Sequence, residues 1–308
     1  MKNIQEIQFN GLLWVNVTKQ AEKELAEVQK RFGFLESDVT ESLPPFQRPK
    51  IMKRENYYFV VLHFPVFDRE TRRLGFTEVD FFLNGNNLIT VHSDKLHVIE
   101  ELFNQCRKHE DQRALYFSGT AVHILFELLN RLLEGIFPIL LHVNDDINLV
   151  DKKLFSQLPS RQMAEEILRL KTNIVTFRRT MQGHRTVLER LIMYSGRDLD
   201  IGSFQTYINN LREFTNEIWH MLESQKESIN ALHETNESLV SLRTSEIMKT
   251  LTIISVITFP LTLFVAWSDV GVRGNFFGMI PGGFAVISLL MLLGASYMIY
   301  FFKKRSWM

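Results

Sequence analysis

The chain has 308 residues, of which 45% are apolar, so it can bury a core in one or two domains and is neither disordered nor fibrous. Lysine plus arginine and aspartate plus glutamate number 35 each, which argues against nucleic acid as a partner. The single cysteine, Cys106, excludes an internal disulfide and a cysteine-rich zinc site, and no apolar run of signal-peptide length opens the chain. We therefore expect the first part of the chain to lie in the reducing cytoplasm.

Short apolar runs alternate with turn signals before about residue 125. The runs NYYFVVLHFPVFD and TEVDFFLNGNNLITVH predict strands of one sheet, with a turn at Asn84-Gly85-Asn86-Asn87. Helices are expected around them, from Lys19 to Arg31 and from Asp94 to Arg107. Residues 1–125 are therefore expected to form an α/β domain.

Long helices are predicted over residues 126–250, because apolar residues there recur three and four positions apart. Breaks are expected at Pro159 and near Ser195-Gly196. From Ile201 through Lys249 there is no proline, and no glycine after Gly202, so the last helix can continue into the apolar segment that follows. A mainly polar helix of this kind indicates a stalk that assembles with copies of itself; the alternative is an ordinary core helix.

Two charge-free segments, residues 251–267 and 276–302, predict transmembrane helices. The first covers roughly 25 Å at 1.5 Å per residue, close to the thickness of a hydrocarbon core. Residues 268–275 form too short a link for anything but an external turn, so both helix ends share one side. Basic residues at that side are Arg243 and Lys249 before the first segment and Lys303, Lys304 and Arg305 after the second.

This distribution places both termini, including the basic tail 303–308, in the cytoplasm by the positive-inside rule. We expect a multi-pass protein of the cell (inner) membrane, with the lipid bilayer as a partner. The alternative is a helical hairpin buried in a soluble protein, but nothing else in the chain is suited to bury it.

The segment HETNESLVSLRTSEIMKTLTIISVITFPLTLF, residues 233–264, resembles the stalk-to-membrane junction of the CorA family of divalent-cation transporters, which is close to NExMKxLTIIxxIFxPLT. FQRPK at 46–50, LHFPVFD at 62–68, EVDFFLNGNNLITVH at 78–92 and the closing FKKRSWM are also similar to family segments. The resemblance implies an α/β cytoplasmic domain followed by long stalk helices and two C-terminal transmembrane helices. It also implies a homopentamer, with the first spans as an inner ring around a central pore.

The family signature Gly-Met-Asn stands at the outer end of the first span. Counting from Pro260, the equivalent residues here are Asp269, Val270 and Gly271, and Gly278-Met279-Ile280 lies seven or more residues later, within the second predicted span. Five copies of Asp269 could form a carboxylate ring that attracts cations, which five copies of Arg273 would oppose. The sequence thus leaves the ion preference open.

Hydroxyl residues mark one face of the first span. Thr252, Ser255 and Thr262 follow three-and-four spacing. Because Mg²⁺ gives up its water reluctantly, hydroxyls suit a pore that holds the hydrated ion; the alternative is that they bond to carbonyls one turn back. The pore-lining positions that the resemblance implies are Met248, Leu251, Ser255, Phe259, Thr262 and Ala266. Met248, Leu251 and Phe259 would be apolar constrictions that close the pore by dewetting.

Regulatory ions bind between subunits through stalk acids in many family members. The corresponding stretch here is YINNLREF, where Asn210 replaces an expected acid, while Glu213 and, further along, Glu234 are retained. The resemblance therefore implies a metal site at Glu213 and Glu234, besides Asp269 at the mouth, and fewer carboxylates make it weaker. The alternative is that these acids are solvated charges. No resident cofactor is expected; Mg²⁺ or another divalent cation is the transported and regulatory ion.

An enzyme or ATP-driven pump is not expected, because no GxxxxGK[ST] loop and no HExxH site occur. Three functions remain. The first is a passive Mg²⁺ or Co²⁺ channel, driven by the inside-negative potential and gated by cytoplasmic ion binding. The second is a transporter of another divalent metal such as Zn²⁺, with or without proton coupling. The third is a non-conducting membrane scaffold or ion sensor.

Overall fold

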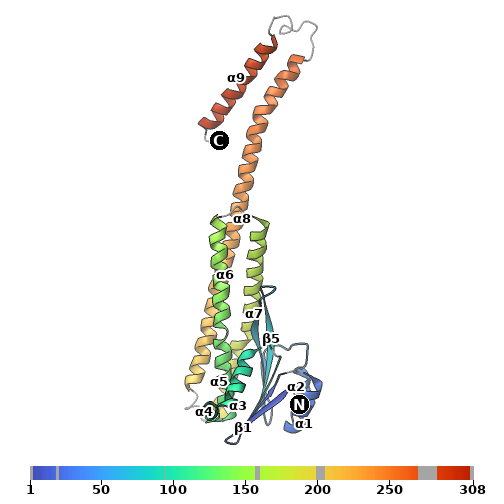
Figure 1. Cartoon of the computed structure of the whole chain (residues 1–308), viewed down its shortest axis with the longest axis vertical. Coiled ribbons are helices and arrows are strands. Elements are labelled where there is room, and N and C mark those ends of the chain that lie inside the picture. The colour runs from blue at the N-terminus through green and yellow to red at the C-terminus, as the bar shows by residue number, and fades with distance from the viewer. Residues whose placement is uncertain are drawn as a thin grey trace. The chain divides into compact units, whose positions relative to one another are not determined.

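The computed structural model describes residues 3–18, 21–93, 95–156, 160–198, 205–269 and 283–305. The chain forms two compact units, Met1–His233 and Glu234–Met308, each described here by itself. The long helix α8 (Gln205–Asp269) belongs in part to both (Figure 1).

A six-stranded sheet in the order β1-β2-β6-β5-β4-β3 organises the first unit. Its strands are β1 (Ile4–Phe9), β2 (Leu12–Val17), β3 (Lys50–Lys53), β4 (Tyr58–Asp68), β5 (Arg73–Asn84) and β6 (Asn87–His92). Only the β2–β6 pair is parallel among these described strands. The predicted strands and turn are confirmed: Asn84 pairs with Asn87, and Gly85 has φ +52°, a conformation that glycine adopts at little cost.

One face of the sheet packs against α1 (Glu22–Phe32) and α2 (Glu36–Glu41). Strand positions alternate between the two faces, so Phe59, Val61 and Phe82 meet Leu25 of α1 in one buried cluster. The helix predicted from Lys19 to Arg31 is confirmed as α1, which ends where Gly33 takes a left-handed conformation.

The helices of the other face are α3 (His97–Lys108), α4 (Glu110–Tyr116), α5 (Ala121–Glu134), α6 (Phe137–Ser156) and α7 (Arg161–Asp198). Trp14 of β2 meets Phe103 of α3 edge-on, with ring centroids 5.0 Å apart. The helix predicted from Asp94 to Arg107 is thus confirmed as α3. Helix α7 lies along β4 and β5 (Figure 1).

The two predicted helix breaks have different outcomes. Helix α7 continues through Ser195-Gly196 to Asp198, so that break lies a few residues later than expected, before α8 begins. Pro159 lies outside the described residues. The prediction of an unbroken helix up to and through the apolar segment is confirmed by α8, which also contains Pro260.

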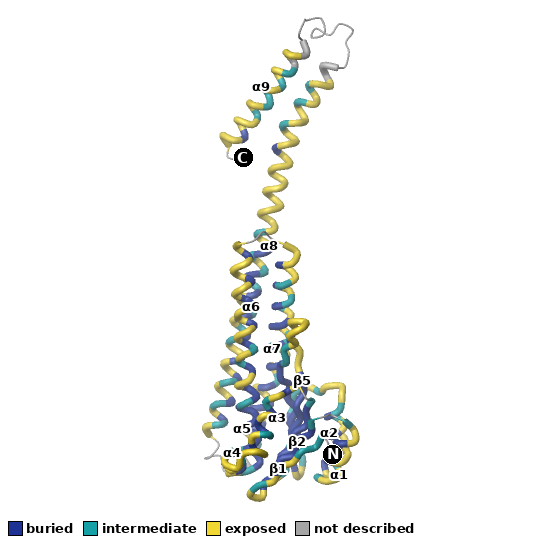
Figure 2. Tube along the Cα trace, viewed as in Figure 1, coloured by how far each residue is buried: buried dark blue, intermediate teal, exposed yellow. Residues whose placement is uncertain are grey.

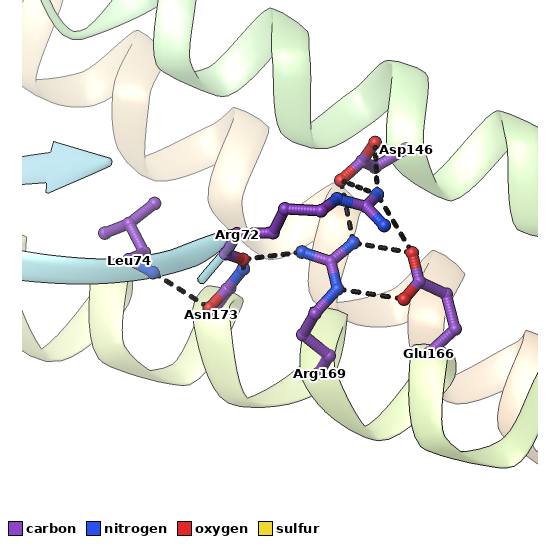
Figure 3. A network of polar contacts seen from close by, with 6 residues as sticks. All are labelled: Arg72, Leu74, Asp146, Glu166, Arg169 and Asn173. Carbon is purple, nitrogen blue, oxygen red and sulfur yellow. Dashed lines mark hydrogen bonds and ion pairs between the residues drawn. The ribbon is translucent and has the colours of Figure 1, made fainter. Parts of the chain in front are cut away.

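A network of charged side chains joins the β4–β5 turn to α6 and α7 (Figure 3). Arg169 Nη2 lies 2.9 Å from Asp146 Oδ2 and 2.7 Å from Glu166 Oε1, and Arg72 reaches the same two carboxylates at 3.2 and 3.0 Å. The hydrogen bond from Arg169 is the main reason that the pKa of Glu166 is lowered. Asn173 also accepts from Leu74 N and donates to the carbonyl of Arg72, both at 3.0 Å. The turn is thereby fixed against both helices.

His184 of α7 is fully buried against β4. Its Nε2 donates to the carbonyl oxygen of His63, and its ring meets Phe64 edge-on with centroids 5.0 Å apart. Burial in this apolar setting lowers the pKa of His184 to about 4. The side chain is therefore neutral in the folded protein at every pH above that value.

Replacing His184 by glutamine should remove part of the acid sensitivity of the first unit. At pH values below about 6.5 the unfolded histidine takes up a proton that the folded one excludes, so the stability contribution is complete above pH 6.5 and falls as the pH drops toward 4. The loss amounts to about 3 kcal/mol over that window. Urea midpoints of the wild-type and H184Q chains at pH 7 and pH 4.5 measure it, and an identical pH dependence in both would refute the assignment.

Candidate functional site

The candidate site is one face of the C-terminal part of α8. Among the described residues one helix, over Gln205–Ala266, is long and apolar enough by length and composition to cross a membrane, and only 6% of its most apolar stretch is buried. Figure 2 shows this part of α8 as mainly exposed. An apolar helix that exposes most of its surface needs a non-aqueous environment or partner helices.

Helix α9 (Gly283–Lys304) covers one face of α8 within the second unit. Ile253 is only 5% exposed, and Ile257, Leu261 and Phe264, which follow it at helical spacing, are half-buried. A Cβ atom placed on Gly294 of α9 would lie 3.8 Å from Leu261 Cδ2, an ordinary van der Waals distance, so the Leu261 side chain reaches α9 at this glycine.

The six predicted pore-lining positions lie on the other side of α8. All are exposed: Met248, Leu251, Ser255, Phe259, Thr262 and Ala266. At 100° per residue, the centre of this face lies about 170° around the helix from the face covered by α9. Phe259 is the extreme case, with 77% of its surface exposed. The structure thus gathers the six residues on one face that no described residue of the unit covers; that they line a pore remains a prediction.

The hydroxyls of this face bond as the alternative interpretation anticipated. Ser255 donates to the carbonyl of Leu251 at 2.9 Å, Thr262 to that of Thr258 at 2.9 Å, and Thr252 to that of Met248 at 2.8 Å. These hydrogen bonds do not prevent the hydroxyls from binding a hydrated ion, because donation uses the hydroxyl hydrogen and leaves the oxygen lone pairs free to accept. Water molecules of a hydrated cation are donors, so the face offers them fixed acceptors.

The predicted pore mouth is only partly described. Asp269 is the last residue of α8, three positions beyond Ala266, which keeps its backbone on the same helix face. Nothing is described of its side chain, and Val270, Gly271, Arg273 and Gly278-Met279-Ile280 lie outside the described residues.

The predicted regulatory acids do not meet within the chain. Glu213 and Glu234 are both exposed, about six turns apart along α8, so one chain cannot hold an ion between them. Among the described residues no group of three or more His, Cys, Asp or Glu side chains is arranged to hold a metal ion. A site at either position would need ligands from another copy or from water.

Sequence reasoning missed an acidic pocket around Asn210. Glu101 of α3 and Glu127 and Glu134 of α5 line it, in a volume of about 510 Å³. Arg131 shares the pocket and pairs with Glu127 at 3.1 Å, which offsets part of the negative charge. The seven-residue spacing of Glu127 and Glu134 on a mainly apolar helix was the available signal, since both then project from one face.

Comparison with known proteins gives consistent matches over nearly the whole chain. A protein-family model described as "CorA-like Mg2+ transporter protein" matches residues 9–304. The "Cobalt/magnesium transport protein CorA" of Thermotoga maritima is 28% identical over 96% of this chain and 83% of that protein. The protein of the same name from Methanocaldococcus jannaschii is 24% identical over 99% of this chain and 94% of its own length.

The fold agrees with a solved structure. The complete structure of the CorA magnesium transporter from Methanocaldococcus jannaschii superimposes with a TM-score of 0.83 at 22% identity, covering 99% of this chain and 94% of that one. The expected fold class, an α/β domain followed by long helices, is thereby confirmed.

Proposed function

Because this chain belongs to the family of CorA-like Mg²⁺ transporter proteins, we propose that it passes Mg²⁺, and with it Co²⁺, through a membrane by way of a central pore in a homopentamer. The family match bears out the resemblance seen in the sequence, and the family is one of transporters rather than enzymes. Transport is passive: an inside-negative potential favours entry of a doubly charged ion by about 5 kcal/mol per 100 mV.

The observation that carries the proposal is the division of α8 into two faces. One face packs on α9, and the opposite face presents Ser255 between the apolar Leu251 and Phe259, with Thr262 about one turn beyond Phe259. Arranged around an axis, five such faces form a water path with rings of hydroxyl acceptors, which hold a hydrated Mg²⁺ without stripping its water. The rings of Met248, Leu251 and Phe259 close the path when water leaves them.

The proposed topology follows from the charges at the helix ends. Residues 251–267 and 276–302 form the two spans and 268–275 the external loop, so that residues 1–250 and the tail 303–308 lie in the cytoplasm of a cell with an inner membrane. Lys303 and Lys304 in the last turn of α9 and the exposed Lys249 support this orientation.

Gating by cytoplasmic divalent cations belongs to the same proposal. Glu213 and Glu234 are exposed on α8, which leaves them accessible to ions and to neighbouring subunits. We assign them to regulatory Mg²⁺ binding between subunits that holds the pore closed. No resident cofactor is required, because the divalent cation is both the cargo and the regulator.

Flux of single metals into liposomes that contain the purified chain tests the proposal. Uptake of Mg²⁺ and Co²⁺ that grows with an inside-negative potential is the expected result. One sequence observation favours a second candidate, a Zn²⁺ transporter: Asp269, Val270 and Gly271 replace the family signature. Zn²⁺ flux without Mg²⁺ flux would establish that candidate, and no flux of any metal would favour a scaffold or sensor.

Replacing Asp269 by alanine should abolish cation uptake in the same liposomes. The proposed carboxylate ring concentrates divalent cations at the mouth, and alanine removes all five charges at once. Asp269→Glu is the matched control, because it keeps the ring of charge and should retain most of the flux. Unchanged uptake by the alanine variant would remove Asp269 from the mechanism.

A further inference from the structure

A second cavity in the first unit has no role in the proposed transport. Its volume is about 700 Å³, and its walls come from the end of β4, the β4–β5 turn, the start of α3, the end of α5 and the start of α6. None of the described residues that line it belongs to α8. The volume lies within the range of 300–1,000 Å³ that is typical of small-molecule sites.

Apolar side chains form the inner wall of this cavity. Phe64, Leu132 and Ile136 are buried there, and Ile139 is half-buried. Phe67 contributes an aromatic ring that meets the ring of His142 edge-on, with centroids 5.0 Å apart. A flat or branched hydrocarbon body would lose its contact with water against these groups.

The remaining side chains give the cavity a basic rim. Arg69, Lys95, His97 and His142 are exposed and line it, and none of the described lining residues is acidic. The whole chain has equal numbers of acidic and basic residues, so the excess of basic side chains around this cavity is a property of the cavity and not of the overall charge. The rim therefore favours an anion over a cation.

The basic side chains of the rim differ in whether they already form ion pairs within the chain. Arg72, which also lines the cavity, is held by Asp146 and Glu166. Within the described parts of the chain no ion pair involves Arg69 or Lys95. Asp68 interacts with Lys95 only weakly: its pKa is lowered chiefly by hydrogen bonds from Thr71, and Lys95 is the smallest of the causes. Two cations thus remain available to a ligand.

We propose that this cavity binds a small organic anion, made of an apolar body about the size of two fused rings and one carboxylate or phosphate head. The body lies against Phe64, Phe67 and Ile139, and the head lies at the rim between Arg69 and Lys95. The ligand needs both a charged head and an apolar body, because the basic rim binds only the head and the apolar inner wall binds only the body. This site is independent of the ion pathway and does not rest on it.

Equilibrium dialysis of the full chain in lipid nanodiscs tests the proposal, with empty nanodiscs as the blank for partition into lipid. The probes are 1-naphthoate and 1-naphthyl phosphate, which distinguish the two head groups. Neutral 1-naphthamide has the body without the charge, and acetate has the charge without the body. We expect at least one of the two naphthyl anions to bind at least tenfold more tightly than both controls. Equal binding of the amide, or no saturable binding of either anion, would overturn the proposal.

Three variants locate the site. Replacing Arg69 and Lys95 together by glutamine should weaken binding of the anion about tenfold or more, because hydrogen bonds to a charged head are lost. Ile139→Glu places a negative charge at the apolar wall and should abolish binding. Lys108→Gln is the matched control and should bind as wild type does, because Lys108 lies at the other end of α3, about 17 Å along the helix from His97 at the rim. Wild-type binding by the double variant would refute the assignment, whatever the outcome of the flux measurements.

Discussion

Thr262→Val should lower Mg²⁺ uptake into liposomes by about tenfold or more, without changing the amount of protein inserted. Valine keeps the shape of threonine and removes only the hydroxyl, which in the structure donates to the carbonyl of Thr258 and leaves its lone pairs on the exposed face. Hydrogen bonds to charged species are worth about 1.5–3 kcal/mol, and the loss of one such bond at the barrier corresponds to a ten- to hundredfold change in rate.

Thr250→Val is the matched control for this experiment. Thr250 donates to the carbonyl of Glu246 at 2.9 Å, the same bond one turn back, but it lies about 120° around α8 from Thr262. Its loss should leave the uptake rate unchanged. Equal loss of flux in the two variants would show that the hydroxyls matter for the helix and not for the ion.

Arg169→Met should loosen the β4–β5 turn by about 3 kcal/mol, the cost of leaving partly buried carboxylates without their main cation. Arg169 bonds to Asp146 and Glu166 and also donates to the carbonyl of Arg72 at 2.6 Å, so one change removes the bonds that join the turn, α6 and α7 through a single side chain (Figure 3). The ion pairs of Arg72 and the hydrogen bonds of Asn173 remain. Hydrogen–deuterium exchange of the full chain measures the effect: amides of residues 68–76 should exchange about a hundredfold faster.

Arg161→Met provides the comparison on the same helix. Arg161 pairs with Glu165 at 2.8 Å, but both side chains are largely exposed, and such pairs contribute little. Exchange in the β4–β5 turn should then match that of the wild type. Exchange as slow as in the wild type would mean that the remaining contacts, the Arg72 ion pairs and the Asn173 hydrogen bonds among them, hold the turn without Arg169.

Much of the fold could be predicted from the sequence because the signals are local. The Asn84–Asn87 turn, the strands beside it and the unbroken α8 follow from turn residues, alternation and the lack of helix breakers. The boundary near Ser195-Gly196 was misplaced by a few residues because a single glycine inside a helix costs only about 1 kcal/mol, which neighbouring packing offsets.

The same difference between local and long-range signals applies to the candidate site. Helical spacing alone was sufficient to place Ser255, Phe259 and Thr262 on one face of α8. It could not show which face α9 covers, because that depends on the contact between Leu261 and Gly294, which lie far apart in sequence. The acidic pocket near Asn210 was missed for the same reason, since its carboxylates come from α3 and α5.

Reaction of single cysteines with a water-soluble thiol reagent tests the central claim most directly. The native thiol does not interfere, because Cys106 is buried and burial raises its pKa to about 11. We predict that Ser255→Cys and Thr262→Cys react in the assembled, conducting protein and lose their flux, while Leu293→Cys, exposed on α9, stays unreactive in lipid. Reaction at Leu293 with protection at Ser255 and Thr262 would contradict a water path along α8.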